Sequence, residues 1–426
     1  MTKKMKDSGY YWIGEIPINW HIRKVKDLYH IQTGFTPDTK KEEYYADEIE
    51  GYDWLTIGDL DGKKYIPQTT KNHISKLYVQ KFNPSVIPQG SLLYSFKLSV
   101  GQVSITNRDI YSNEAIAAFV PNNSVCLEFL YYSSSMIVEN ANENIYGAKI
   151  LNQELIRNAR VVNPPIDEQK KIALFLNAKC AELDNVLEKT HASIEEYKKL
   201  KQAVIAQAVT KGVRGNREMK DSGIEWIEEI PAEWKTIRIK WILNERKEKS
   251  ENGEEEPLSM SQKYGIVPTK EMEIVPNMAS SFIGAKIVYS GDLVFNKLKA
   301  HLGVFAVSEY DGLVSPDYAV YYSQGIIDVK YLEYLFKTPE YIAEFKKRSS
   351  GVGAGLTRLY TDELYDIYCL LPPQDEQIEI TGYLNKKIGE IDVLIKKKEQ
   401  YLSEIENYKK SLIYEYVTGK KEVPQE

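Results

Sequence analysis

The sequence predicts an α+β protein with a pseudo-two-fold internal repeat. In this fold, two domains of mixed sheet and helix are separated by two long antiparallel coiled-coil helices. Three observations predict it: a duplicated opening motif, a second duplicated motif ahead of two helical segments, and a regular apolar stripe along both segments. The length of 426 residues fits two or three domains at roughly 100 to 200 residues each.

The two repeats divide the chain into tandem copies. MKDSGYYWIGEIPINW at 5–20 returns as MKDSGIEWIEEIPAEW at 219–234, with 11 of 16 positions identical. PPIDEQ at 164–169 returns as PPQDEQ at 372–377. Repeats of this kind indicate one structural plan used twice. We therefore expect a first domain at 1–163, a long helix at 164–213, a linker at 214–218, a second domain at 219–371, a second long helix at 372–418 and a tail at 419–426.

The middles of the two copies differ. Residues 29–85 and 243–286 show no convincing match, and likeness resumes only weakly where 89–93 face 290–294. We interpret this as two equivalent scaffolds with different surfaces, although drift after duplication would leave the same pattern. Local composition predicts strands at 91–96, 101–105 and 286–289, and helices at 127–136 and 329–335.

The two long helices are expected to begin after the paired prolines, with Asp167 and Asp375 as caps. Their apolar positions step alternately by four and three, which is the 3.5-residue period of a coiled coil. A pair of ordinary core helices is the alternative, but the length and sustained phase favour the coiled coil. Approximate two-fold symmetry would make the pair antiparallel, with Gly212 and Gly419 after the helix ends. The seam residues expected to pack the helices and dock partners are Leu176, Leu183, Leu187, Ile194, Ile388, Ile391, Ile395, Leu402 and Ile405.

Composition narrows the function classes. Three cysteines lie far apart, which excludes a disulfide framework and a cysteine-based zinc site, and the chain is expected to be cytoplasmic with no membrane span. The net charge is -6, and the two domains carry 18 Lys+Arg against 18 Asp+Glu and 18 against 24. A DNA-binding face must therefore be a local patch.

Several of these motifs resemble the specificity subunit of type I restriction-modification systems. The P-P-x-x-E-Q openings are followed by E-[LI]-D at 182–184 and 390–392, and the helices end in V-T-K-G or V-T-G-K. The first copy adds GFTP at 34–37 and WLTIGDL at 54–60, which look like stretches of the family's recognition domains. The second copy departs from both, so it resembles a different recognition-domain subtype.

The resemblance implies a non-catalytic subunit that gives a DNA modification and restriction system its specificity. Each target recognition domain would read one half of a split, asymmetric site in double-stranded DNA. The helices would act as a spacer and as a docking surface for two methyltransferase subunits, and restriction subunits would complete the endonuclease. The resemblance implies no cofactor in this chain, with S-adenosylmethionine, Mg²⁺ and ATP bound by the partner subunits.

Motifs for chemistry within the chain are weak. Asn163 and the prolines after it resemble an adenine methyltransferase loop, but the aromatic residue that would stack the flipped base is missing. Nuclease-like patterns can be written from Asp38, Asp61 and Lys63 and again from 316–346, at unmatched places in the copies. No phosphate-binding G-x-x-x-x-G-K-[ST] occurs, and the five histidines lack metal-ligand spacing. The sequence therefore predicts no metal site and no catalytic residue.

DNA contact requires cationic or amide donors in turns, because phosphates and base edges are read by such groups. The predicted contact residues are Ser95, Lys97, Lys149, Asn152, Asn296, Lys297, Lys299, His301, Arg348 and Arg358. Two other functions stay open: a self-contained restriction enzyme or methyltransferase, and a coiled-coil scaffold that only joins proteins. A scaffold would still work after charge reversal at Lys97 and Lys297.

Overall fold

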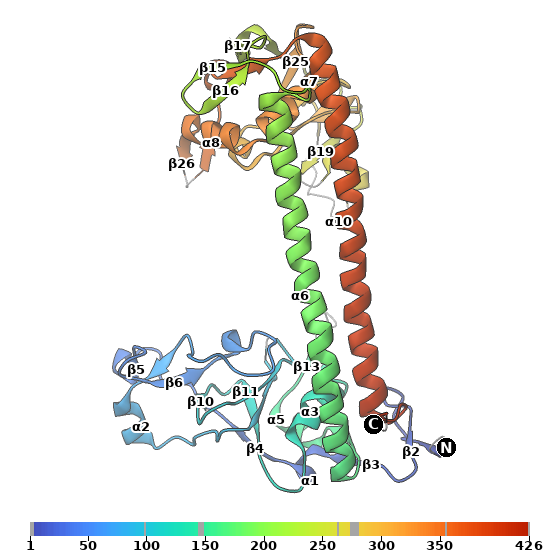
Figure 1. Cartoon of the computed structure of the whole chain (residues 1–426). Coiled ribbons are helices and arrows are strands. Elements are labelled where there is room, and N and C mark those ends of the chain that lie inside the picture. Colours follow the sequence, from blue (N-terminus) through green and yellow to red (C-terminus); the bar gives the residue numbers. More distant parts are fainter. Residues whose placement is uncertain are drawn as a thin grey trace. The chain divides into compact units, whose positions relative to one another are not determined.

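The chain forms two compact units. The computed structural model describes residues 4–97, 99–143, 149–261, 264–272, 281–353 and 356–424. The first unit contains Met1–Thr190 and Tyr401–Glu426, and the second contains His191–Gln400. Each unit therefore combines one predicted domain with part of both long helices (Figure 1).

A four-stranded antiparallel sheet is the centre of the first domain. Its strand order is β4-β11-β8-β9. Strand β3 pairs antiparallel with β14 at the point where the chain enters and leaves the domain. The framework elements are β1 Met5–Asp7, β2 Glu15–Pro17, β3 His21–Lys24, α1 Val25–Leu28, β4 His30–Thr33, β8 Leu92–Ser95, β9 Val103–Ile105, β11 Ile116–Val120, α3 Leu127–Ser133, α4 Ser135–Val138, β12 Asn142–Glu143, β13 Lys149–Ile150, α5 Gln153–Asn158 and β14 Arg160–Asn163.

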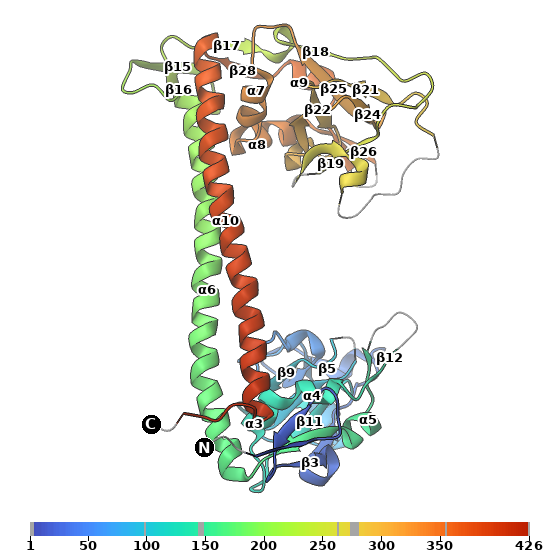
Figure 2. The same ribbon diagram turned by 90° about the vertical axis from the view of Figure 1, so that its right-hand side faces the viewer.

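The second domain repeats this topology. Its sheet has the order β18-β25-β22-β23, and β17 pairs with β28 as β3 pairs with β14 (Figure 2). The framework elements are β15 Met219–Ile224, β16 Ile227–Pro231, β17 Lys235–Arg238, η3 Ile239–Trp241, β18 Leu243–Glu245, β22 Leu293–Asn296, η5 Ala300–Leu302, β23 Phe305–Val307, β25 Tyr318–Ser323, α7 Val329–Phe336, α8 Pro339–Arg348, β26 Ser350–Gly353, β27 Leu356–Arg358, α9 Thr361–Tyr365 and β28 Tyr368–Leu371. The expected equivalence of the two scaffolds thus extends into the middles, where the sequences do not match.

The additions to each framework are different. The first domain adds a second four-stranded sheet of order β10-β6-β7-β5, whereas the second adds the two-stranded pairs β19-β20 and β21-β24. These elements are η1 Glu42–Tyr44, β5 Tyr45–Ala46, β6 Tyr52–Leu55, η2 Ile57–Asp59, β7 His73–Ile74, α2 Lys76–Phe82 and β10 Tyr111–Ser112, and then β19 Leu258–Ser261, β20 Gly265–Pro268, η4 Thr269–Glu271, β21 Lys286–Val288 and β24 Gly312–Val314. The two domains therefore present unlike surfaces on like scaffolds.

Most predicted elements of the middles are confirmed. Strands β8, β9 and β21 lie within the predicted strand segments, and α3, α4 and α7 match the predicted helices. Helices α2 and α8 were not predicted, because their seven and ten residues lack a long apolar period of their own. Short helices of this kind are stabilised mainly by tertiary packing.

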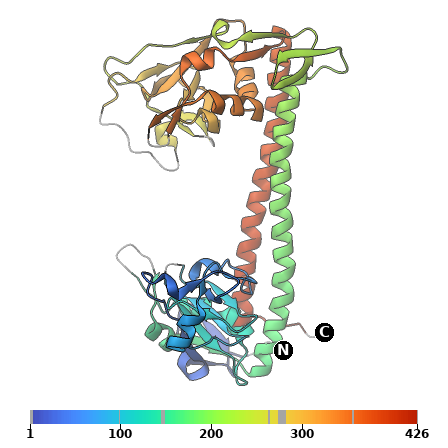
Figure 3. The ribbon, with the colours of Figure 1, turned by 90° about the vertical axis from the view of Figure 1, so that its left-hand side faces the viewer.

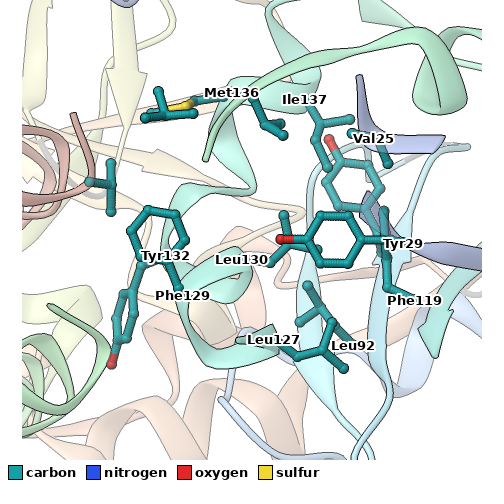
Figure 4. Packing of buried hydrophobic residues seen from close by; sticks show 14 of the residues in the cluster. Val25, Tyr29, Leu92, Phe119, Leu127, Phe129, Leu130, Tyr132, Met136 and Ile137 are labelled. Carbon is teal, nitrogen blue, oxygen red and sulfur yellow. The ribbon is translucent and has the colours of Figure 1, made fainter. Parts of the chain in front are cut away.

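The core of each unit joins its domain to both long helices. In the first unit, Tyr29 and Phe119 pack edge to face at 5.7 Å beside Leu130 (Figure 4). The same core contains Leu176 from the first long helix and Tyr416 from the second. In the second unit, the β15-β16 ribbon packs beside the end of the first long helix (Figure 3). Each domain is thus anchored on a helix pair.

The long helices are α6, Ile166–Lys211, and α10, Gln374–Val417. The prediction that Asp167 and Asp375 cap them is wrong. The helices begin at the residue before each aspartate, so both carboxylates lie in the first turn. There they still favour the positive helix end. Gly212 and Gly419 follow the helix ends with φ of 75° and 72°, as glycines after helices commonly do. No helix in the described parts of the chain combines the length and apolar character that crossing a bilayer needs.

The predicted seam residues lie on the inner side of the helices within each unit. Every predicted seam position is buried or partly buried, and Leu176 is fully buried. In the first unit Lys409 of α10 pairs with Asp184 of α6, and in the second Lys201 of α6 pairs with Asp392 of α10. These two ion pairs occupy equivalent positions in the copies. The helices are antiparallel in both units, and seam lysines fix their register.

The two duplicated motifs bind one another. In the first unit the indole N–H of Trp20, from the opening motif, donates to Glu168 of the helix opening at 3.0 Å. In the second unit Trp234 donates to Glu376 at 2.9 Å. Glu376 is fully buried and also pairs with Arg217. Each Trp–Glu contact therefore fastens the start of a domain to the start of its helix.

The glutamine of each helix opening fastens the helix to the domain at a second point. The Gln169 amide donates to the Pro164 carbonyl, and its oxygen accepts the N–H of Cys126, just before α3. Gln377 makes the equivalent contacts to Pro372 and to Asp328, just before α7. Each of the two D-E-Q segments thus attaches a long helix to its domain and has a structural role rather than a chemical one.

Candidate nucleic-acid interface

The turn after β8 holds the first predicted contact residues. Ser95 is fully buried, and its hydroxyl donates to the carbonyl of Ser99 at 2.6 Å. Ser95 is not placed for a direct DNA contact, because its buried hydroxyl stabilises the turn from the interior of the domain. Lys97 is half exposed, and its ammonium lies 3.5 Å from the Glu114 carboxylate. Lys97 is therefore the accessible cation of this turn.

Glu114 is held as an anion beside Lys97. A hydrogen bond from the Thr36 hydroxyl lowers the pKa of Glu114, and the charge of Lys97 lowers it further. Thr36 belongs to the GFTP segment, so this segment helps to place the carboxylate. A phosphate that approached Lys97 would compete with Glu114 for the ammonium.

The turn after β22 is the equivalent feature of the second domain. Asn296 ends β22, and its side-chain oxygen accepts the N–H of Leu298 at 3.1 Å. Lys299 is exposed just before η5, and His301 is partly buried within η5. Asn296 thus has a role in the turn itself, whereas Lys299 is free to reach a ligand.

Lys297 lines an open cavity of about 660 Å³ in the second domain. Burial lowers the pKa of Lys297, and the nearby charge of Lys286 adds to the effect. The cavity wall includes Lys247 and is rich in tyrosine, with Tyr322, Tyr360 and Tyr365. The wall also contains the carboxylates of Glu245 and Asp362. Its aromatic faces and lysines suit contacts to bases and phosphates.

The remaining candidates of the first domain lie near the β12-β13 hairpin. The Lys149 ammonium pairs with Glu139 at 3.0 Å. Asn152 is the N-cap of α5, where its oxygen accepts the N–H of Leu155 at 2.8 Å. Among the described residues, no hydrogen bond or ion pair joins either one to the Lys97 turn. The side chain of Asn152 therefore caps α5, and the ammonium of Lys149 forms an ion pair.

In the second domain, Arg358 lies close to Lys297. The backbone N–H of Leu359 donates to the Lys297 carbonyl at 3.0 Å, and Arg358 pairs with Asp317 at 2.7 Å. Arg348 is farther along the chain and pairs with Glu344 within α8. The fold thus brings Lys297, Lys299 and Arg358 to one end of the sheet. DNA contact by these residues stays a prediction.

The WLTIGDL and GFTP segments have a structural explanation. The Asp59 carboxylate accepts the Thr56 N–H at 2.8 Å and the Lys71 N–H at 2.9 Å, and Asp59 is the buried partner of the N-cap Thr56 in the capping box of η2. The Trp54 indole donates to the Phe35 carbonyl at 3.0 Å. Among the described residues, no group of three or more His, Cys, Asp or Glu side chains is arranged to hold a metal ion. The WLTIGDL carboxylate is therefore part of a turn.

Sequence reasoning missed Lys247 and the tyrosines around Lys297. The segment 358–365 offered a signal, since it places Arg358, Tyr360 and Tyr365 at short spacing. Lys247 offered none, because it lies 50 positions from Lys297 and only the pairing of β18 with β25 and of β25 with β22 brings the two near one cavity. Nothing in the sequence indicated that Ser95 is buried.

Replacing Lys297 by methionine should stabilise the chain and weaken DNA binding. The lowered pKa means that folding penalises the charged lysine, so removing the charge should raise the denaturation midpoint. In the wild type, the free energy of unfolding should rise as pH increases from the lowered folded pKa toward 10.5, because the unfolded state then binds more protons. DNA affinity should fall about tenfold.

Chemical denaturation and duplex-binding titrations check both effects. Lys299→Met is the matched control, since Lys299 is exposed and its loss should change the free energy of unfolding by no more than about 0.5 kcal/mol. A Lys297→Met chain that bound DNA with unchanged affinity would remove Lys297 from the interface.

The sequence of this chain is similar to those of known proteins. The family model described as the type I restriction modification DNA specificity domain matches residues 17–196. Two subunits of Methanocaldococcus jannaschii match over nearly the whole chain. The putative MjaX specificity subunit is 25% identical over 96% of this chain and 95% of its own length, and the MjaVIII specificity subunit is 24% identical over 95% and 93%. The chain is similar over nearly its whole length to type I restriction-modification specificity subunits.

Two solved structures share the fold of this chain. A chain from a study of complex assembly and conformational transition in the type I R-M system matches with a TM-score of 0.70 and 13% identity, over 94% of this chain and 98% of its own. The HsdS subunit of Thermoanaerobacter tengcongensis matches with a TM-score of 0.51 and 14% identity, over 95% and 98%. The shorter match to the MjaIX specificity subunit is 28% identical over 39% of each chain. The two solved chains therefore share the α+β fold of this chain.

Proposed function

We propose that this chain provides the DNA sequence specificity of a type I restriction-modification complex and carries out no chemistry itself. Each recognition domain reads one half of a bipartite, asymmetric site in double-stranded DNA. The observation that carries the proposal is the identical framework topology with unlike additions, β10-β6-β7-β5 in one domain and β19-β20 with β21-β24 in the other. Equivalent scaffolds with different surfaces suit two different half-sites.

The helices serve as spacer and docking surface in this proposal. Helix α6 runs unbroken for 46 residues and α10 for 44. Apolar side chains remain exposed on them outside the seam, such as Leu174 at 72% and Ile378 at 64%. Two methyltransferase subunits per chain would bind there, and restriction subunits would complete the complex.

The reaction chemistry is assigned to the partners. S-adenosylmethionine, Mg²⁺ and ATP would be bound by methyltransferase and restriction subunits, and the specificity subunit would only place the complex on DNA. The buried, satisfied state of Asp59 and the fastening role of the D-E-Q segments support this division. The cytoplasm, where such complexes meet DNA, is the expected location.

Reconstitution tests the proposal against a self-contained enzyme. We expect labelled methyl transfer to duplex DNA only when this chain and its methyltransferase subunit are both present with S-adenosylmethionine. The methyltransferase subunit with a heat-denatured chain is the control. Methylation or Mg²⁺-dependent cleavage by the purified chain alone would refute the assignment of chemistry to the partners.

A further inference from the structure

Two lysines of the first domain converge on one tyrosine. The ammonium of Lys41, just before η1, lies 3.3 Å from the Tyr44 hydroxyl, and the ammonium of Lys81 in α2 lies 3.2 Å from the same oxygen. Both ammonium groups also lie over the Tyr44 ring, at 5.2 and 5.5 Å from its centre. Two cations thus share one neutral acceptor atom.

The phenol is fixed in place by packing. Tyr44 is 3% exposed, and its ring packs edge to face against Tyr78 and Phe82 at 5.2 and 5.5 Å. The Ser75 hydroxyl donates to the Glu43 carbonyl, and the Ser75 N–H donates to the Tyr44 carbonyl. The chain segments that carry Lys41 and Lys81 are therefore locked together, while both lysines are exposed.

Neither lysine of this cluster forms an ion pair among the described residues, although, beside the hydrogen bond to Tyr44, the nearby charges of Asp38 and Glu43 help to raise the pKa of Lys41. The predicted contact cations Lys97, Lys149 and Arg358 each lie within 4.0 Å of a carboxylate. In the described part of the chain, neither Lys41 nor Lys81 has a carboxylate at that distance; the phenol is the partner of both. A phenol accepts hydrogen bonds but carries no formal charge to balance two ammonium groups.

The same geometry favours negative charge on an oxygen. Hydrogen bonds from Lys81 and Lys41 lower the pKa of the Tyr44 hydroxyl. Each ammonium has three N–H donors, and at most one of them is used by Tyr44. The free donors and the phenol hydrogen are suited to the oxygens of a tetrahedral anion. Charge-assisted hydrogen bonds of this kind are the strong ones.

We infer that Lys41, Lys81 and Tyr44 form a clamp for one phosphodiester group of duplex DNA. The inference rests on the proposed function, because it takes the ligand to be the DNA that the first domain reads. The domain has no net positive charge, so backbone attraction must come from such local groups. Phosphate contacts position a protein on the duplex and carry no sequence information directly. The clamp therefore sets position, and other side chains of the domain read bases.

The salt dependence of binding tests the clamp in the assembled complex with its methyltransferase. For Lys41→Ala/Lys81→Ala, we expect the slope of log Kobs against log salt to become shallower by about one, since the contact to one phosphate contributes about 0.9. Affinity should fall about tenfold or more on every duplex, so the ratio between preferred and scrambled duplexes should not change. Tyr44→Phe should show a smaller loss of affinity.

The matched control is Lys26→Ala/Lys76→Ala, which removes two exposed lysines from the same domain. If both double variants changed the slope equally, the clamp would be refuted. Circular dichroism of each variant checks folding, and the milder Lys41→Gln/Lys81→Gln change should give the same slope if folding is intact. A wild-type complex that bound all duplexes alike would instead contradict the proposed function.

Methylphosphonate scanning identifies the phosphate. Neutralising one phosphate at a time should reveal one position that weakens wild-type binding but has no further effect on Lys41→Ala/Lys81→Ala. Titration with inorganic phosphate at constant ionic strength separates the two sources of phosphate oxygen. Phosphate binding that is lost in the variant, together with an unchanged DNA slope, would show a site for a free anion and overturn the assignment to DNA.

Discussion

Glu376→Ala is expected to lower the free energy of unfolding by about 3 to 5 kcal/mol. Glu376 is fully buried, accepts the Trp234 indole N–H at 2.9 Å, and pairs with Arg217, whose side chain is only 12% exposed. Removing the carboxylate leaves a cation and an indole N–H in a largely dry site. Chemical denaturation of the full chain measures the loss.

The first unit offers the matched control. Glu168→Ala removes the equivalent acceptor of the Trp20 indole, but Glu168 is only partly buried. Its replacement should therefore cost about 1 to 3 kcal/mol. Glu376→Gln keeps the shape and one acceptor and should lie between the two alanine variants. Equal losses for Glu168→Ala and Glu376→Ala would contradict the importance of the buried ion pair.

A graft of the first recognition domain into the second position should convert the site into an inverted repeat. Residues 25–159 would replace 239–367, because both segments lie between equivalent paired strands, with Lys24 opposite Arg160 and Arg238 opposite Tyr368. The equivalent seam ion pairs of the two units mean that exchanging the copies preserves the helix pairing. Two identical domains, each at the start of one of two antiparallel helices, should read two identical half-sites in opposite orientation.

The effect of the graft should be large. Each mismatched base pair costs about 1 to 3 kcal/mol, so losing a half-site of several base pairs should weaken binding to the original sequence by about a thousandfold or more. Mapping of methylated sites by the reconstituted complex provides the consensus, after circular dichroism has shown that the graft folds. A folded graft that kept the asymmetric consensus would show that the second domain does not read DNA.

The sequence was sufficient for features that repeat or have a regular period. The Trp20 and Trp234 motifs, the two helix openings and the 3.5-residue seam were all visible, because they depend on local spacing. The pairings inside the domains were not visible. Their strands are two to six residues long and join segments such as 30–33 and 117–120, which are far apart in the chain. Register of this kind is set by burial on one face rather than by local sequence.

The interface was predicted less completely for a similar reason. Composition identified Lys97 and Lys297 as donors in equivalent turns, but it could not show that Ser95 is buried or that Asn152 is a helix cap. The clamp was missed because Lys41 and Lys81 are 40 positions apart and meet only through the packing of η1 against α2. Single residues reveal the donor type, whereas tertiary contacts decide which donors are available.

The central claim is that two unlike domains read two unlike half-sites. The most direct test is to map every position methylated by the wild-type complex on genomic DNA. We predict a consensus of two different specific parts separated by a fixed number of unspecified base pairs. A single continuous sequence, two identical halves, or methylation without sequence preference would contradict the claim.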